Sequence, residues 1–427
     1  MRLLTAIASL LTLSAAAANY PTSEPIKSIP LPPEGQRWIV NEQLTDEFDG
    51  DTLDQTKWID HHPTWRGREP GLFMPKNIAL KGGCMVLHGE KMERDTVIKG
   101  TTYNVSCAAV VSREQIAHYG YYECRFKANQ STLSSTFWFS TRGGAKSTEG
   151  RQPKGAVKGK FGQELDVCEC IGRTGDFKGK FFADGMNSNV HYWFSPDGGG
   201  EKQNITIKET RLKNEDGSKP ADGFNTYGCW WRDKNSASFY LNNGQETHRE
   251  FVGRAKWGKP YDINFNFTEP MSLNMVVETY PYPWIPLPTD EELADPQRNR
   301  TLYDWVRAYT LVDAAEANRG AKRMYMFESR VNIADKPTAF DRKCLTLSLH
   351  YTSPEDCSIE LAIYDAKSDK QIGKESIKAA AGYANIKLES SVARKAKSGK
   401  EYYIVVRITD ENGNVAEGDS FLARAEE

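Results

Sequence analysis

This chain of 427 residues lacks a basic excess. It has 55 Lys and Arg against 57 Asp and Glu, for a formal net charge of -2. Proteins that bind nucleic acids through their phosphates normally carry a clear excess of Lys and Arg. The charge balance therefore argues against a general nucleic-acid binder, and we expect no nucleic-acid partner.

Long apolar runs are also scarce. Beyond the N-terminus, no segment approaches the roughly 20 apolar residues that a membrane-spanning helix needs. Residues 1–18 combine Arg2, a short apolar stretch and a run of alanines that ends at Ala18, which is the pattern of a secretory signal peptide. We predict cleavage after Ala18 and an exported protein, secreted or periplasmic, without a membrane span.

Metal-binding patterns are sparse as well. The eight cysteines include one close pair, Cys168 and Cys170, whose spacing does not match a zinc site. No acidic run resembles the loop of an EF-hand. We predict no cofactor, assign no disulfide, and interpret most of the cysteines as small buried apolar residues.

Helical periodicity is weak from residue 34 to residue 318, where short strand-like runs alternate with turns. Tyr122, Cys124 and Phe126 alternate with charged residues, as in a half-buried strand, and the pair Gly82-Gly83 predicts a tight hairpin. Many short strands with turns between them indicate an all-β sandwich. One exception is the capping pattern at residues 289–293, which predicts the start of a short helix.

A polar stretch at residues 315–325 separates this region from a C-terminal region of different texture. Strand-like runs such as 359–364 and 402–408 follow, with Ser, Asp, Gly and Lys between them. We predict a second, small β-sandwich of immunoglobulin or fibronectin type over residues 326–427, and we interpret it as an accessory module.

Three acids lie within six residues, in the segment Glu-Leu-Asp-Val-Cys-Glu at 164–169. Glu164 and Asp166 are two residues apart, so on a strand they point to the same face. Glu169 is five residues from Glu164, which would send it to the opposite face of a regular strand. One extra residue near Val167, a β-bulge, would return Glu169 to the shared face.

Three carboxyl groups on one face of a strand repel one another, and a structural strand has no use for that arrangement. Glycoside hydrolysis does, because it needs one carboxylate and one carboxylic acid beside the bond that is cut. The acid segment is therefore the candidate catalytic centre of a glycosidase.

The acid segment matches the Glu-x-Asp-x-x-Glu signature of glycoside hydrolase family 16. Flanking segments resemble the same family in order, and the last two resemble its red-algal galactanase branch most, which includes the β-agarases and β-porphyranases and is related to the κ-carrageenases. These segments are residues 46–50 with Trp58, 73–77, 121–126, 137–139, 224–231 and 303–307. Residues 34–318 are thus identified as a catalytic domain of this family.

The resemblance implies a β-jelly-roll of two curved sheets with an open cleft on the concave face, and retaining endo-hydrolysis of a polysaccharide. It implies that Glu164 is the nucleophile and Glu169 the general acid/base. Asp166 lies between them and is expected to help keep Glu164 ionised and to raise the proton affinity of Glu169. A structural calcium is known in the family but is not indicated by these residues.

Five further residues are candidates for substrate binding, and most of them have a structural alternative. Trp138 either stacks on a sugar ring or belongs to the core. Trp65 and Arg66, in a loop, either hold a galactose ring and its substituents or are simply solvated. The resemblance suggests sugar binding for His191 and Glu278; for Glu278 the alternative is a structural ion pair.

The exact substrate stays open between agarose or porphyran and a sulfated galactan of κ-carrageenan or hybrid type. Residues 143–160 form a basic loop just before the acids, which favours sulfate, whereas residues 224–231 and 303–307 favour an agarase or porphyranase. A laminarinase fits those segments less well. A galactan-binding protein without activity is the remaining alternative, although all three acids are present. We expect a monomer.

Overall fold

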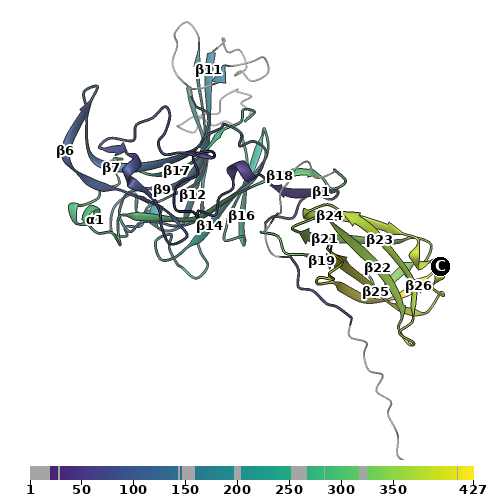
Figure 1. Ribbon diagram of the computed structural model, residues 1–427. Helices are drawn as coiled ribbons and strands as arrows, with labels where there is room; N and C mark the ends of the chain where they lie inside the picture. Colours follow the sequence, from purple (N-terminus) through teal and green to yellow (C-terminus); the bar gives the residue numbers. More distant parts are fainter. Residues whose placement is uncertain are drawn as a thin grey trace, which may run out of the picture. The chain divides into compact units, whose positions relative to one another are not determined.

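Strands make up most of the computed structural model, with a single short α-helix among the described residues (Figure 1). The described residues are 20–26, 29–142, 145–146, 159–196, 203–251, 267–282, 284–316, 324, 326–410 and 412–427. The predicted signal peptide and most of the basic loop lie outside them. The prediction of an all-β fold is confirmed, and within the described residues no helix is long and apolar enough to cross a membrane.

The chain divides into two units. The larger contains Trp38–Leu311, and the smaller contains Val312–Glu427 together with Leu31–Arg37 and the described residues before Lys27. Strand β1 (Gln36–Val40) lies where the two meet in sequence.

One sheet of the larger unit carries the three acids. Its strands lie in the order β13-β12-β11-β9-β17-β7-β2, with β10, β3 and β6 paired at its margins. Their bounds are β13 Gln203–Leu212, β12 Met186–Pro196, β11 Gly159–Cys170, β9 Ser135–Ser140, β17 Ser272–Val277, β7 Thr101–Ser112, β2 Trp58–Ile59, β10 Ala145–Lys146, β3 Gly71–Phe73 and β6 Glu90–Ile98.

A second sheet packs against the first. It runs β16-β15-β14-β8-β18, and β5 joins β18 to β4. The bounds are β16 Gln245–Glu250, β15 Ser236–Leu241, β14 Asn225–Asp233, β8 Gly120–Lys127, β18 Arg300–Asp313, β5 Met85–His88 and β4 Ile78–Leu80. Between the sheets lies one apolar core, in which the rings of Tyr122 and Phe139 lie 4.9 Å apart.

The local predictions hold in this unit. Gly82 and Gly83 take positive φ angles of 64° and 72° in the β4–β5 hairpin. Helix α1 (Asp290–Ala294) begins with the predicted capping box, in which Thr289 and Glu292 bond to each other's backbone N–H groups. The remaining helical turns of the described residues are short 3-10 turns, at Glu42–Leu44, Pro75–Asn77 and Lys180–Ala183 in this unit and at Val392–Lys395 in the smaller one.

Strand β8 departs from the predicted alternation at one position. Tyr122, Cys124 and Phe126 point into the core as expected, but Glu123 on the other side is also buried, with 3% of its surface exposed. The hydroxyls of Tyr121 and Tyr309 donate hydrogen bonds to its carboxyl group, at 3.3 and 3.1 Å. Burial raises the pKa of Glu123 to about 7.

The smaller unit is a β-sandwich of its own. One sheet has the order β24-β21-β19 and the other β20-β26-β25-β22-β23, with an apolar core between them. The bounds are β19 Arg330–Ile333, β20 Ala339–Asp341, β21 Leu345–Ser353, β22 Cys357–Asp365, β23 Gln371–Ala379, β24 Gly382–Ser390, β25 Glu401–Thr409 and β26 Asp419–Glu426.

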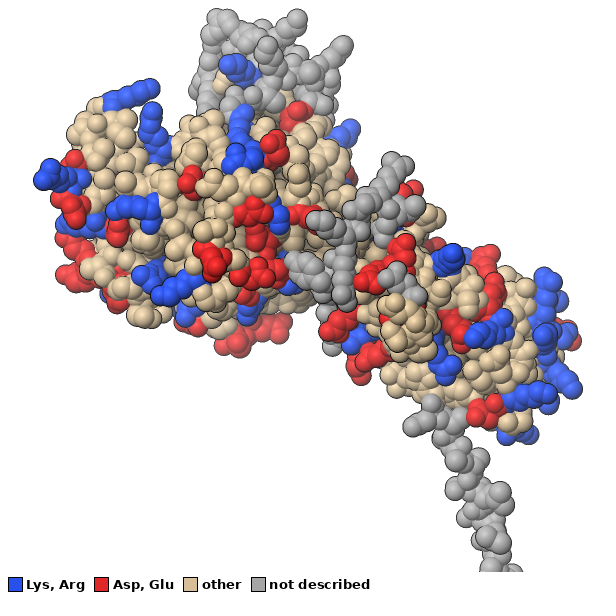
Figure 2. Space-filling view, in the orientation of Figure 1, with Lys and Arg blue, Asp and Glu red and all other residues tan. Residues whose placement is uncertain are grey.

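Two further expectations concern the surface and the cysteines. On the face that Figure 2 displays, acidic and basic side chains of the described residues are interspersed, as the charge balance predicts. All eight cysteines are free thiols, and six of them are buried, so the interpretation of most as small core residues is confirmed; the exceptions are Cys84 and Cys344.

Candidate active site

The predicted β-bulge lies in β11. Against β9, Asp166 is paired with Trp138 and Cys168 with Phe137, so two steps along β11 match one step along β9. Val167 is the extra residue, and both Val167 and Cys168 are fully buried. The extra residue reverses the alternation, which places Glu169 on the same face as Glu164 and Asp166.

A bulge leaves backbone groups without their ladder partners, and neighbouring side chains from β12 satisfy them here. The Ser188 hydroxyl donates to the carbonyl oxygen of Val167 at 2.6 Å. The Asn187 amide donates to the carbonyl oxygen of Glu169 at 3.0 Å. The distorted strand is therefore held by specific partners, which fix where the acids point.

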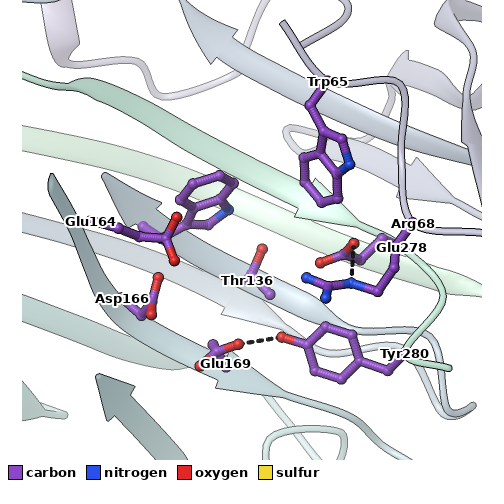
Figure 3. Close-up of a pocket in the computed structure, with 9 residues that line it drawn as sticks. Trp65, Arg68, Thr136, Glu164, Asp166, Glu169, Glu278 and Tyr280 are labelled. Carbon is purple, nitrogen blue, oxygen red and sulfur yellow. Dashed lines mark hydrogen bonds and ion pairs between the residues drawn. The ribbon is translucent and has the colours of Figure 1, made fainter. Parts of the chain in front are cut away.

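The three acids line one pocket of about 200 Å³, together with six residues from neighbouring strands and loops (Figure 3). Figure 3 shows Glu164, Asp166 and Glu169 pointing into the same hollow. The other lining residues are Trp65, Arg68, Thr136, Trp138, Glu278 and Tyr280.

Backbone geometry decides which residue of the loop Trp65-Arg66-Gly67-Arg68 enters the pocket. Gly67 has φ of 118°, and a Cβ there would lie 2.5 Å from the carbonyl oxygen of Gly71. The carbonyl of Arg66 accepts from the Phe73 N–H at 2.8 Å, and that of Arg68 from the Gly71 N–H at 2.7 Å. In this loop Arg68 lines the pocket, whereas Arg66 is exposed and does not.

Arg68 links the residues of one wall of the pocket to one another. Its Nε lies 3.1 Å from Oε2 of Glu278, and its Nη1 donates to the Tyr282 hydroxyl at 2.7 Å. Its guanidinium carbon also lies 5.4 Å from the ring centre of Tyr280 and 5.7 Å from that of Trp65. Because burial disfavours the charged form, the pKa of Glu278 is raised to about 7, although Arg68 opposes the rise.

Tyr280 is the nearest partner of Glu169, to whose Oε1 its hydroxyl donates a short hydrogen bond. Burial raises the pKa of Tyr280 well above its usual value, so this hydroxyl stays protonated and acts as a donor. A donor to one carboxyl oxygen fixes the orientation of the group and stabilises its ionised form.

Burial and mutual repulsion raise the pKa values of two acids on β11. Burial, and then repulsion by Glu169, raise the pKa of Glu164 to about 8. Burial and repulsion by both glutamates also raise the pKa of Asp166 well above its usual value. Closely spaced buried carboxyl groups tend to retain protons. The expectation that Asp166 helps to keep Glu164 ionised stays a prediction.

His191 contacts the acids from β12. Its Nε2 lies 3.4 Å from Oδ2 of Asp166, and its Nδ1 lies 3.0 Å from the Thr206 hydroxyl. It does not line the acid pocket itself. Glu164, Asp166 and His191 offer three ligand atoms within 4.8 Å of one another, a set that is able to hold a metal ion. Such an ion would occupy the groups that hydrolysis needs.

Aromatic side chains form part of the wall of the pocket. The rings of Trp138 and Trp65 lie edge to face at 6.4 Å, and His62 stacks parallel to Trp138 at 6.1 Å. Trp138 is half-buried and lines the pocket, so it is not a purely internal core residue. Burial and the charge of Arg142 lower the pKa of His62 to about 4, so it is neutral near pH 7.

The structure thus gathers most of the predicted residues and adds others. Arg68 belongs to the loop at residues 65–68 that the sequence offered for substrate binding. Six residues that the sequence did not single out for this site contribute to it or support it. Tyr280 and Tyr282 follow β17 in an aromatic Tyr-Pro-Tyr-Pro-Trp run, which is the one signal that the sequence offered for them. The six are Thr136, Asn187, Ser188, Thr206, Tyr280 and Tyr282.

Comparison with protein families matches both parts of the chain. Residues 38–311 match the model of the GH16 domain of β-porphyranases A–D. Residues 331–418 match the model of a porphyranase-associated domain. The first match contains the whole of the acid pocket.

Individual relatives are similar over long stretches. β-Porphyranase D from Zobellia galactanivorans is 39% identical over 425 residues, which is 95% of this chain and 95% of that protein. β-Porphyranase B from Phocaeicola plebeius is 37% identical over 302 residues, 69% of this chain and 91% of that protein. The crystal structure of a β-porphyranase from the human gut bacterium Bacteroides plebeius is 35% identical, with a TM-score of 0.57, and covers 67% of this chain and 96% of that one.

Proposed function

Because this chain belongs to the β-porphyranases of glycoside hydrolase family 16, we propose that it hydrolyses β-linkages inside porphyran-type red-algal galactans with retention of configuration. The chain is a glycoside hydrolase. Its relatives are named as β-porphyranases, which supports red-algal galactans as its class of substrate. Agarose, the alternative within the same branch, is a second substrate to test.

We assign the chemical steps to the two glutamates on β11. Glu169 donates its proton to the glycosidic oxygen while the carboxylate of Glu164 bonds to the anomeric carbon and the bond to the leaving sugar breaks. Glu169, now ionised, then takes a proton from water, whose oxygen attacks the anomeric carbon and releases Glu164. Each cycle ends with Glu164 ionised and Glu169 protonated.

In this scheme, Asp166 holds the proton that the buried acids retain in addition to the one on Glu169. Burial and repulsion by both glutamates raise the pKa of Asp166 well above its usual value, which favours a protonated Asp166. Neutral Asp166 adds no repulsion to an ionised Glu164 and is able to donate a hydrogen bond toward it. His191, 3.4 Å from Asp166, orients that carboxyl group.

The remaining pocket residues bind the sugar. Trp138 and Trp65 offer apolar faces to pyranose C–H groups, whereas Arg68 and Glu278 offer a charged pair of donors and acceptors to hydroxyls. We keep Glu278 as a substrate-binding residue on this basis. Substrate binding by His191, which contacts Asp166 but does not line this pocket, stays a separate proposal. For Arg66, which is exposed, we propose at most a contact with sugars outside the pocket.

The observation that carries this proposal is the bulge that turns all three acids into one pocket. A reducing-sugar assay on porphyran, agarose and κ-carrageenan tests it, with product expected from porphyran first. Cleavage of κ-carrageenan alone would favour the sulfated-galactan alternative. Tight binding of a galactan without product from any of the three would favour the non-catalytic binding protein.

We further propose that the mature chain is exported after removal of residues 1–18, acts as a monomer and needs no cofactor for hydrolysis. Mass determination of the N-terminus, light scattering, and activity after exhaustive dialysis against a chelator test the three points. Residues 326–427 are proposed as an accessory module, so their deletion is expected to leave hydrolysis of short oligosaccharides in place.

A further inference from the structure

One buried carboxyl group of the acid pocket has no hydrogen-bond donor. Asp166 has 5% of its surface exposed, and no N–H or hydroxyl group of the described residues donates to its side chain. Its ion-pair partner among these residues is Nε2 of His191 at 3.4 Å, which is longer than the usual N–H···O bond of about 2.7–3.2 Å. Buried polar side chains normally have a hydrogen-bond partner, so this carboxyl group calls for a functional explanation.

Two neighbouring carboxyl and imidazole groups complete a compact set around it. Glu164, Asp166 and His191 each present one ligand atom, and the three atoms lie within 4.8 Å of one another. In the sheet, Glu164 of β11 is paired directly with His191 of β12. Asp166 is two residues further along β11, on the same face. Two adjacent strands therefore position the whole set, and rigid elements of this kind hold a binding site more precisely than loops do.

The separation within this set suits a tetrahedral metal ion. Two ligand atoms that are each about 2.0–2.1 Å from a tetrahedral zinc ion lie roughly 3.4 Å from one another. Nε2 of His191 and Oδ2 of Asp166 have a separation of 3.4 Å. The side chain of Glu164 has several rotatable bonds, so a rotation of its carboxyl group closes the remaining gap. Three protein ligands with a fourth position open are a common arrangement around zinc.

The imidazole of His191 has the outer partner that a metal ligand needs. Thr206 of β13 is paired with His191, and its hydroxyl oxygen lies 3.0 Å from Nδ1 of the ring. A hydroxyl that accepts from Nδ1–H leaves the lone pair of Nε2 directed at the two carboxyl groups. Histidines that bind metals usually make such a hydrogen bond through their second nitrogen, which fixes the tautomer and the orientation of the ring.

The chemistry of the three ligands selects the class of metal. Calcium and magnesium prefer shells made of oxygen ligands, six or more in number, and an imidazole is a poor ligand for them. One imidazole nitrogen with two carboxylate oxygens suits zinc and the neighbouring transition metals. Zinc is the simplest probe of this class, because it has no redox chemistry.

We propose that Glu164, Asp166 and His191 form a zinc-binding site, and that zinc bound there reversibly inhibits hydrolysis. The inhibition rests on the proposed function, because it requires Glu164 to be the nucleophile. A carboxylate oxygen that is coordinated to zinc is not available to attack the anomeric carbon. The binding of zinc depends on the three side chains alone.

Zinc chloride is the probe, added to the full chain, and magnesium and calcium chloride are the comparison ions. Zinc affinity is measured by calorimetry, and kcat/KM on porphyran is measured with zinc and again after a chelator is added. The variants are His191→Ala, His191→Gln, Thr206→Val and, for calorimetry alone, Glu164→Gln. His248→Ala is the matched control, since His248 lies on β16 of the other sheet and faces a single carboxyl group, with Nε2 2.8 Å from Oε1 of Glu250.

Saturating zinc is expected to lower wild-type kcat/KM at least about tenfold, and the chelator restores it. Loss of an outer partner lowers metal affinity about 10- to 100-fold, so Thr206→Val should weaken zinc binding by at least about tenfold. His191→Ala and Glu164→Gln remove a ligand itself and should weaken it more. His248→Ala leaves the affinity and the inhibition unchanged. The inhibition of each variant is expressed relative to its own activity without zinc, so that a change in basal activity does not enter.

Several outcomes would overturn the proposal. Wild-type zinc affinity in both His191→Ala and Glu164→Gln would exclude the site. If His191→Ala fails to fold, His191→Gln and Glu164→Gln decide instead. Equal inhibition by magnesium or calcium, or tight binding of zinc without inhibition, would exclude the inhibitory role. A wild type that cleaves no galactan refutes the proposed function, and calorimetry then still decides whether these three residues bind zinc.

Discussion

Replacing Glu164 by Gln is expected to abolish turnover and, at alkaline pH, to stabilise the protein. The amide has nearly the size of the carboxyl group but neither attacks the anomeric carbon nor ionises. Loss of a nucleophile that acts together with a general acid is expected to lower kcat at least about 10⁴-fold. The gain in stability follows from the same burial that raises the pKa of this residue.

The magnitude comes from the pKa of Glu164, which rises from 4.5 to about 8 on folding. Between these values the unfolded chain has released a proton that the folded chain keeps, so wild-type stability falls as pH rises through this window. Each pH unit corresponds to about 1.4 kcal/mol, and the whole window to roughly 5 kcal/mol. The repulsion is shared among the neighbouring carboxyl groups of Asp166 and Glu169, so removing one of the charges recovers only part of this free energy. We expect Glu164→Gln to gain about 2–3 kcal/mol over wild type between pH 5 and pH 9.

The assay is urea unfolding followed by tryptophan fluorescence at pH 5 and pH 9. All ten tryptophans lie between residues 38 and 305, so the signal reports on the larger unit alone. Glu93→Gln, at an exposed position in β6, is the matched control and should follow wild type at both pH values. The reasoning fails if Glu164→Gln retains more than a tenth of wild-type kcat, or if its midpoint falls with pH as steeply as that of wild type.

Three further substitutions test other contacts. Arg68→Met should lower kcat/KM at least about tenfold, because it removes bonds to the pocket wall, whereas Arg66→Met should stay within about threefold; equal losses in steady-state kinetics on porphyran would contradict this. Tyr280→Phe removes a hydrogen bond to the ionised form of Glu169, worth about 1.5–3 kcal/mol, so kcat should fall about 10- to 100-fold with KM little changed, and unaltered kcat would rule the contact out of the reaction. Burial of Glu123 raises its pKa, so the stability of the wild type should fall as pH rises from about 4.5 to 7, and Glu123→Gln should make this fall less steep. An unaltered slope of urea midpoint against pH would show that the raised pKa of Glu123 is not the cause.

The shared direction of the three acids could be predicted from the sequence because side chains along a strand alternate with a fixed period of two residues. Two-residue spacing placed Glu164 and Asp166 together, and the five-residue spacing to Glu169 required one extra residue, which the structure has at Val167. The all-β fold could be predicted for a related reason, since short alternating runs with turns between them are compatible with few other fold classes.

The positions of side chains on loops could not be predicted in the same way. Arg66 and Arg68 have the same chemistry and flank one glycine, so only the backbone of that loop decides which of them enters the pocket. Tyr280 reaches Glu169 across 111 residues, a contact that no local pattern encodes. Glu123 follows the alternation of an exposed position, yet neighbouring tyrosines bury it.

The extra residue in β11 has a consequence for how such enzymes diverge. Val167 sends its side chain into the core and lets Glu169 regain the direction of Asp166. A strand one residue shorter, with no kink, would present three acids in the same direction by plain alternation. Lineages that gain or lose this residue would thus keep their reactive trio, and length variation here is a poor guide to lost activity.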